Sequence, residues 1–159
     1  MLRSLLPLLL TLLCWLPLAG PAIASIHTYP EAEGRTMVRS LQTLRDSRDR
    51  AWQLVFFQRR QPGQVLQTEL RLVGFPGLRL SHPQALTVRT GFGQRWQAPD
   101  DFEREPNLTT NVGQYDLAQV ITELEGSPAL ELELPEDRLQ LTVPPFIIRE
   151  WQRLTDTPS

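Results

Sequence analysis

The chain has 159 residues and a formal net charge of −2 at pH 7, from 16 basic and 18 acidic side chains. Every basic side chain is an arginine, which excludes Schiff-base and lysine general-base chemistry. The slightly acidic total also argues against a nucleic-acid partner.

Residues 1–24 have the pattern of a secretory signal peptide. A short basic region precedes an apolar run over residues 5–18, and a small-x-small cleavage site ends at Ala24. The run is shorter than the roughly 20 apolar residues that a membrane-spanning helix needs. The sequence therefore predicts an exported protein whose mature part, residues 25–159, is one globular domain without a transmembrane segment. The single cysteine, Cys14, falls in the leader, so thiol chemistry is excluded from that domain.

An apolar stretch at residues 50–57, Arg-Ala-Trp-Gln-Leu-Val-Phe-Phe, forms the centre of the mature chain. In an extended strand, Trp52, Leu54 and Phe56 share one face, while a valine and a second phenylalanine lie on the other. Large apolar side chains on both faces indicate a central strand that is covered on each side. We therefore expect this strand to organise the core.

The sequence around this stretch predicts antiparallel strands. Residues 25–34 are expected to form an extended arm. Residues 36–45 should then pair with the central strand through a polar turn, with a bulge near Ser40 to keep the apolar side chains in phase. Turn signals at glycines and prolines separate further short strands, as in a meander. These are residues 65–74, 78–81, 85–89 and 95–97.

The C-terminal half changes character twice. Residues 99–113 are polar, acidic and aperiodic, which predicts a long loop, either functional or flexible. Residues 117–124 carry one apolar stripe of an amphipathic helix. Strict alternation over residues 130–134 and 139–143 predicts a hairpin, and a final helix is expected over residues 146–154.

Together these elements predict an α+β fold. Its main part is a curved antiparallel β-sheet of six to eight strands, arranged as a meander, a half-barrel or a sandwich. Two short helices near the C-terminus are expected to pack on this sheet.

Catalytic and metal-binding patterns are sparse. The two histidines, His27 and His82, are far apart in the sequence, and the acidic residues 100–105 lack the calcium-loop spacing. The chain also has no nucleophile elbow, and its Gly-Phe-Gly segment at residues 91–93 lacks the third glycine of a dinucleotide fingerprint. We predict neither a metal nor a cofactor, and we favour a non-enzymatic role.

Arginines on the expected strand faces form one surface hypothesis. Guanidinium groups bind carboxylates through two parallel hydrogen bonds, so an arginine-rich face could dock an acidic partner. Alternatively, these arginines pair with acidic residues of the C-terminal half, such as Glu131, Glu133 and Glu136. The arginines in question are Arg59, Arg60, Arg71, Arg79, Arg89 and Arg95.

Five segments carry a resemblance to a known family. They are Ser-Ile-His-Thr-Tyr-Pro-Glu at residues 25–31, Arg-Ser at residues 39–40, Leu-Arg-Asp at residues 44–46, Arg-Ala-Trp-Gln at residues 50–53, and Pro-Phe-Ile-Ile-Arg-Glu-Trp at residues 145–151. With these segments the chain resembles a family of small exported cyanobacterial proteins of unknown function. The resemblance implies a location in the periplasm or the thylakoid lumen, close to photosynthetic membrane complexes. It implies no catalytic residue.

Two functions remain open from the sequence. The first is a non-enzymatic accessory or interaction protein of the thylakoid lumen or periplasm that associates with a membrane protein complex. The second is a binding module for a small apolar ligand, a lipid or a pigment, in a cavity between the sheet and the helices. Aromatic side chains predicted to line that cavity are Phe56, Phe57, Phe92 and Trp96.

Overall fold

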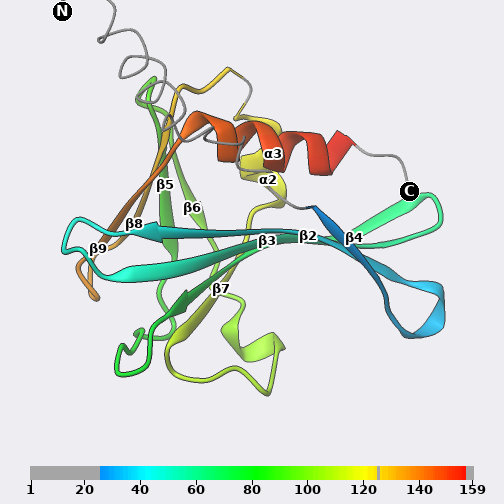
Figure 1. Ribbon diagram of the computed structural model, residues 1–159, viewed down its shortest axis with the longest axis horizontal. Helices are drawn as coiled ribbons and strands as arrows, with labels where there is room; N and C mark the ends of the chain where they lie inside the picture. Colours follow the sequence, from blue (N-terminus) through cyan, green and yellow to red (C-terminus); the bar gives the residue numbers. More distant parts are fainter. Residues whose placement is uncertain (1–25, 125, 157–159) are drawn as a thin grey trace, which may run out of the picture.

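The computed structural model describes residues 26–124 and 126–156, so the predicted leader lies outside the described residues. The described chain forms two antiparallel sheets and two α-helices (Figure 1). Sheet A has the strand order β1-β2-β3-β4-β7, and sheet B has the order β6-β5-β8-β9. The elements are β1 (His27–Pro30), η1 (Ala32–Gly34), β2 (Thr36–Arg45), β3 (Ala51–Gln61), β4 (Gln64–Gly74), β5 (Leu86–Thr90), β6 (Arg95–Ala98), η2 (Phe102–Arg104), β7 (Val112–Asp116), α2 (Ala118–Thr122), β8 (Leu130–Leu134), β9 (Leu139–Val143) and α3 (Pro145–Asp156).

The predicted central strand is β3, the middle strand of sheet A. Trp52, Leu54 and Phe56 are buried on its inner face, as the alternation predicts. The pairing of β2 with β3 runs without interruption past Ser40, so the bulge expected there is wrong. The register instead shifts between Arg59 and Arg60, where β3 pairs with β4.

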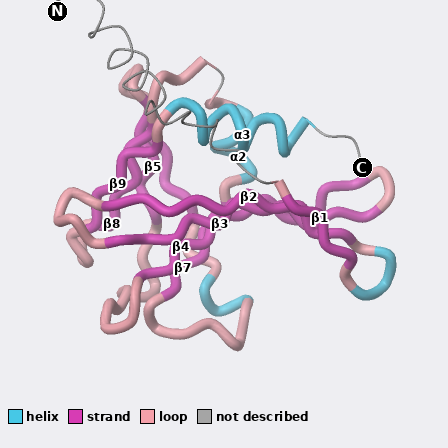
Figure 2. The backbone as a smooth tube through the Cα atoms, in the orientation of Figure 1, coloured by secondary structure: helices cyan, strands magenta, loops and turns pink. Residues whose placement is uncertain are grey.

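Sheet B and the helices complete the core. The leucines of the predicted hairpin, now β8 and β9, are buried and alternate with more exposed polar residues. Helix α3 begins at Pro145, as a proline in the first turn allows, and its Trp151 ring stacks on Phe56 with 5.0 Å between ring centres. Figure 1 shows α3 and α2 on the same side of sheet A, and Figure 2 shows sheet B at one end of the long strands with β1 at the other end.

The antiparallel α+β class is thus confirmed, as are both helices and the C-terminal hairpin. The described residues form nine strands in two sheets, instead of six to eight in one. Two of the strands come from unexpected places: the predicted arm contains β1, and the predicted acidic loop ends in β7. Residues 78–81, in contrast, form no strand. No helix in the described part of the chain is long and apolar enough to cross a membrane.

Strand β7 was missed because one of its inward positions is a glycine. Gly113 and Tyr115 lie on the same face, and the Tyr115 ring covers Gly113, so a methyl group at Gly113 would come within 2.8 Å of the ring carbon Cε2. The short hydrophobic pattern that identifies a strand is therefore absent from the sequence.

Gly113→Ala is expected to lower the free energy of unfolding by about 1 to 3 kcal/mol, because the fully buried Tyr115 ring cannot move aside without straining the core. Chemical denaturation measures the change. In a Tyr115→Phe background the same substitution should cost less, because the phenol oxygen, which has no hydrogen-bond partner, approaches Gly113 most closely. Equal costs in the two backgrounds would contradict this account.

Candidate functional site

The six arginines of the predicted docking face do not form one surface. They divide among four places in the described structure. Arg59 and Arg71 lie on the outer face of sheet A, Arg89 and Arg95 are cross-strand neighbours on sheet B, Arg79 is exposed in the segment after β4, and Arg60 is buried.

Arg60 corrects the docking hypothesis most clearly, because its side chain is only 2% exposed. Its Nε donates a hydrogen bond to the Gln58 side-chain oxygen at 2.9 Å, and its Nη2 donates to the backbone oxygen of Leu154. Arg60 therefore joins β3 to the last turns of α3. The sequence contained the signal: Arg60 is an even number of residues from Phe56, so both side chains lie on the inner face.

The outer face of sheet A carries a network of charged side chains. Arg59 donates to Glu31 at 3.3 Å and to Glu105 at 2.5 Å, while Arg71 donates to the Gln114 side chain. The guanidinium carbons of Arg59 and Arg71 each lie 5.4 Å from the centre of the Phe57 ring. The second apolar face of β3 is thus covered by arginines and their partners and not by a second layer of the core.

Glu69 lies beside Phe57 in this network and is only 1% exposed. Its Oε2 has no hydrogen-bond partner. Burial is the main reason that the pKa of Glu69 is raised to about 7. The nearby carboxylates of Asp101 and Glu105 also raise this pKa, whereas the guanidinium groups of Arg59 and Arg71 lower it. A carboxyl group with a shifted pKa can mark a catalytic site, but Glu69 lines none of the described pockets.

His82 has a structural position. Its Nδ1 lies 2.7 Å from Oδ2 of Asp100, its Nε2 lies 3.1 Å from the backbone oxygen of Val112, and the ring stacks on Phe102. Both ring nitrogens therefore contact protein groups, one shortly after β6 and the other at the start of β7. Because the ring also stacks on Phe102, it holds η2 beside the ends of these two strands. His27 lies far away on the exposed strand β1. Among the described residues, no three potential metal ligands gather in one place.

The four aromatic residues predicted to line a cavity do not surround one. Phe56 stacks on Trp151 in the core, and Phe57 lies on the opposite face of β3 under its two arginines. Trp96 packs against the core from β6, whereas Phe92 is exposed at the turn between β5 and β6. The predicted cavity lining is therefore wrong. Alternation places Phe56 and Phe57 on opposite faces, so the two rings could not share a cavity.

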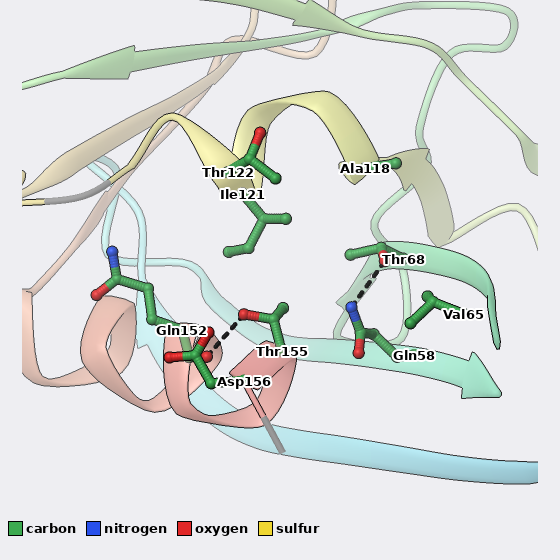
Figure 3. A pocket seen from close by; sticks show the side chains of 9 residues that line it. All are labelled: Gln58, Val65, Thr68, Ala118, Ile121, Thr122, Gln152, Thr155 and Asp156. Carbon is green, nitrogen blue, oxygen red and sulfur yellow. Dashed lines mark hydrogen bonds between the residues drawn. The ribbon is translucent and has the colours of Figure 1, made fainter. Parts of the chain in front are cut away.

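A groove does lie between the sheet and the helices, where a cavity was expected. It has a volume of about 730 Å³. It lies between α2, the last turns of α3, the C-terminal end of β3 and the N-terminal end of β4 (Figure 3). We call it the helix–sheet groove. Its lining residues are Gln58, Val65, Thr68, Ala118, Ile121, Thr122, Gln152, Thr155 and Asp156.

Hydroxyl and amide groups make up most of the polar lining of the helix–sheet groove. The Gln58 amide donates to the Thr68 hydroxyl at 2.9 Å, so these two groups are already paired across β3 and β4 (Figure 3). Asp156 is the one charged side chain among the nine described residues that line the groove. None of the hydrogen bonds described among these nine residues pairs a nucleophile with a base.

A family model described as a protein of unknown function, DUF3122, matches residues 24–154. The chain belongs to the DUF3122 family. No curated protein and no solved structure matches it.

Sequence reasoning missed most of the groove of this DUF3122 protein. Its lining comes from β3, β4, α2 and α3, whose residues span positions 58 to 156. Each segment has an ordinary amphipathic pattern, and no spacing connects one segment to another. One partial signal was available, since Gln58 interrupts the apolar inner face of β3 and predicts a polar group at that end of the strand.

Proposed function

We propose that this DUF3122 protein is a non-enzymatic interaction protein that holds a segment of a partner polypeptide in the helix–sheet groove. The observation that supports this proposal is the groove itself: an open channel formed by side chains from four separate elements. The leader pattern of residues 1–24 and the family resemblance of the mature sequence favour the thylakoid lumen or the periplasm as its location. A membrane protein complex, such as a photosynthetic complex, is the partner that we propose for that location.

The chemistry of the lining fits a peptide backbone. Thr122 and Gln152 provide donors and acceptors for backbone amides, and Ile121 and Val65 provide apolar contacts for side chains. The Arg60 contact to Leu154 fixes α3 relative to β3, so the groove is preformed and loses little entropy on binding. A partner segment with a basic residue would also find Asp156 at the groove.

Ala118→Arg should reduce partner binding at least tenfold, because a long charged side chain would fill the groove from α2. Ala118 is exposed, so the fold should tolerate the change. Crosslinking with mass spectrometry in the native membrane fraction first identifies the partner, and titration with that partner measures the loss. The matched control is Gln119→Arg, which places the same charge on the next exposed position of α2, outside the groove lining.

Equal losses for the two variants would mean that charge on α2, and not occupancy of the groove, determines binding. If no membrane protein crosslinks to groove residues in the native compartment, the proposed function is wrong.

A small apolar ligand is the second candidate, since the groove lies where the apolar cavity was expected. Val65, Ala118 and Ile121 give it an apolar side. Native mass spectrometry of protein purified from its own compartment distinguishes the two candidates. A bound lipid or pigment that Ala118→Arg displaces would favour the ligand carrier over the polypeptide-binding protein.

A further inference from the structure

Three connecting segments meet at one end of sheet B. Thr90 of β5 pairs with Leu130 of β8, and Leu130 pairs with Val143 of β9, so the chain leaves or enters all three strands side by side. The residues next to these strand ends are uncharged, although the connection from α2 to β8 also contains Glu123 and Glu125. We call this end the apolar tip, and its segments are residues 91–94, 126–129 and 144–146.

The apolar tip exposes two phenylalanine rings. Phe92 at the β5–β6 turn is 68% exposed, and Phe146 in the first turn of α3 is 50% exposed. Isolated exposed apolar residues are common on protein surfaces, but here two exposed rings lie at the same end of one sheet, on the segments either side of residues 126–129. The tip therefore offers an apolar surface that no described part of the chain covers.

The exposure of Phe92 does not come from a loose loop. The Gly93 amide donates to the Thr90 oxygen at 3.0 Å, and the Gly91 amide donates to the Ala129 oxygen at 3.1 Å. The turn also packs closely, since a methyl group at Gly91 would come within 2.7 Å of the Pro128 ring. The fold thus holds the Phe92 ring outward from a fixed backbone.

An arginine lies close in the sequence to each of the two rings. Arg95 opens β6, next to the β5–β6 turn, and Arg149 follows Phe146 by three residues on the same side of α3. Both arginines are exposed. An aromatic ring with an arginine close to it is the arrangement that interfacial membrane-binding segments use, because the ring enters the headgroup region while the guanidinium contacts phosphates.

We infer that the apolar tip docks on an anionic lipid surface, with Phe92 and Phe146 entering the headgroup region and Arg95 and Arg149 against lipid phosphates. A lipid surface fits better than a protein partner, because neither ring lines any of the described grooves and a fluid bilayer accepts isolated rings without a matching pocket. This site is independent of the helix–sheet groove, which lies at the other end of α3 and stays accessible when the tip is docked.

Vesicle co-sedimentation tests the inference with residues 25–159, which contain every described element and lack the leucine-rich leader that would itself bind lipid. The protein should sediment with vesicles of phosphatidylcholine and phosphatidylglycerol, and less with phosphatidylcholine alone. Phe92→Ser and Phe146→Ser should each weaken binding about tenfold, and Arg95→Gln and Arg149→Gln about fivefold each, an effect that added salt removes.

Phe75 provides the matched control. It is 56% exposed and follows β4 of sheet A, directly after Gly74, whose amide donates to the Asn111 backbone oxygen. Phe75→Ser should leave vesicle binding unchanged. Thermal unfolding of each variant confirms that the fold is intact.

A tryptophan in place of each ring gives a direct readout. Emission from Phe92→Trp should shift to shorter wavelength with anionic vesicles and should be quenched by brominated lipids, whereas Phe75→Trp should show neither change. An unshifted Phe92→Trp emission, or equal losses for Phe75→Ser and Phe92→Ser, would overturn the inference. So would a Phe92→Ser variant that keeps full vesicle binding but loses a crosslinked protein partner.

Discussion

Trp52→Ala is expected to lower the free energy of unfolding by about 3 to 5 kcal/mol. The Trp52 side chain is only 1% exposed and packs on Gly74 of the neighbouring strand β4. Its indole nitrogen also donates to Oδ2 of Asp46 at 3.0 Å, in the turn between β2 and β3. The substitution therefore leaves a large cavity in the core and removes one support of the hairpin that leads into β3.

The cost should divide between these two contributions. Burial acts to raise the pKa of Asp46, but hydrogen bonds from Arg50, Trp52 and Arg48 outweigh it and hold the pKa below its usual value. Trp52→Phe keeps a buried aromatic ring, removes the indole hydrogen bond and leaves a smaller cavity than Trp52→Ala, so it should cost less, about 1 to 3 kcal/mol. Denaturant unfolding of both variants measures the difference. A Trp52→Ala cost near that of Trp52→Phe would mean that the ring is not part of the core.

Glu69→Gln is expected to remove a pH dependence of about 3 kcal/mol from the stability of the protein. The pKa of Glu69 is raised from 4.5 to about 7 in the folded state. Its protonated form is therefore favoured by folding, and the stability that it contributes is fully present below about pH 4.5 and lost as the pH rises through about 7. The neutral glutamine has no such transition.

The measurement is the difference in unfolding free energy between Glu69→Gln and the unaltered protein, followed across this pH range. The variant should gain about 3 kcal/mol relative to the unaltered protein between about pH 4.5 and pH 8. Other titrating groups, including Asp46, contribute equally to both proteins and largely cancel. Glu103→Gln, an exposed change in η2, keeps the buried carboxyl and should keep the slope. A constant difference across the range would contradict the raised pKa of Glu69.

The two faces of β3 explain why one strand supports both predictions. Its inner face, with Trp52, packs against sheet B and the helices, whereas its outer face, with Phe57, lies beside Glu69 and beneath two arginines. The first face contributes mainly apolar burial, which does not depend on protonation. The second face makes part of that stability depend on protonation, because a buried carboxyl and its charged neighbours replace a second apolar layer.

Local patterns in the sequence determined most of the secondary structure. The alternation over β8 and β9, the helical period of α2 and the proline at the start of α3 were sufficient, because each is a property of adjacent residues. The same reasoning identified β3 as the central strand. It failed at β7, where a buried tyrosine covers a glycine and the apolar alternation disappears.

Only the tertiary structure decided where candidate binding surfaces form. Alternation alone separates Arg59 from Arg60, but it cannot tell which acidic residues will meet Arg59, since Glu31 and Glu105 come from distant segments. Likewise, the helix–sheet groove and the apolar tip each arise where several elements end together. The sequence determined these elements through short-range periodicity, while the sites depend on contacts between residues far apart in the chain, which no local pattern encodes.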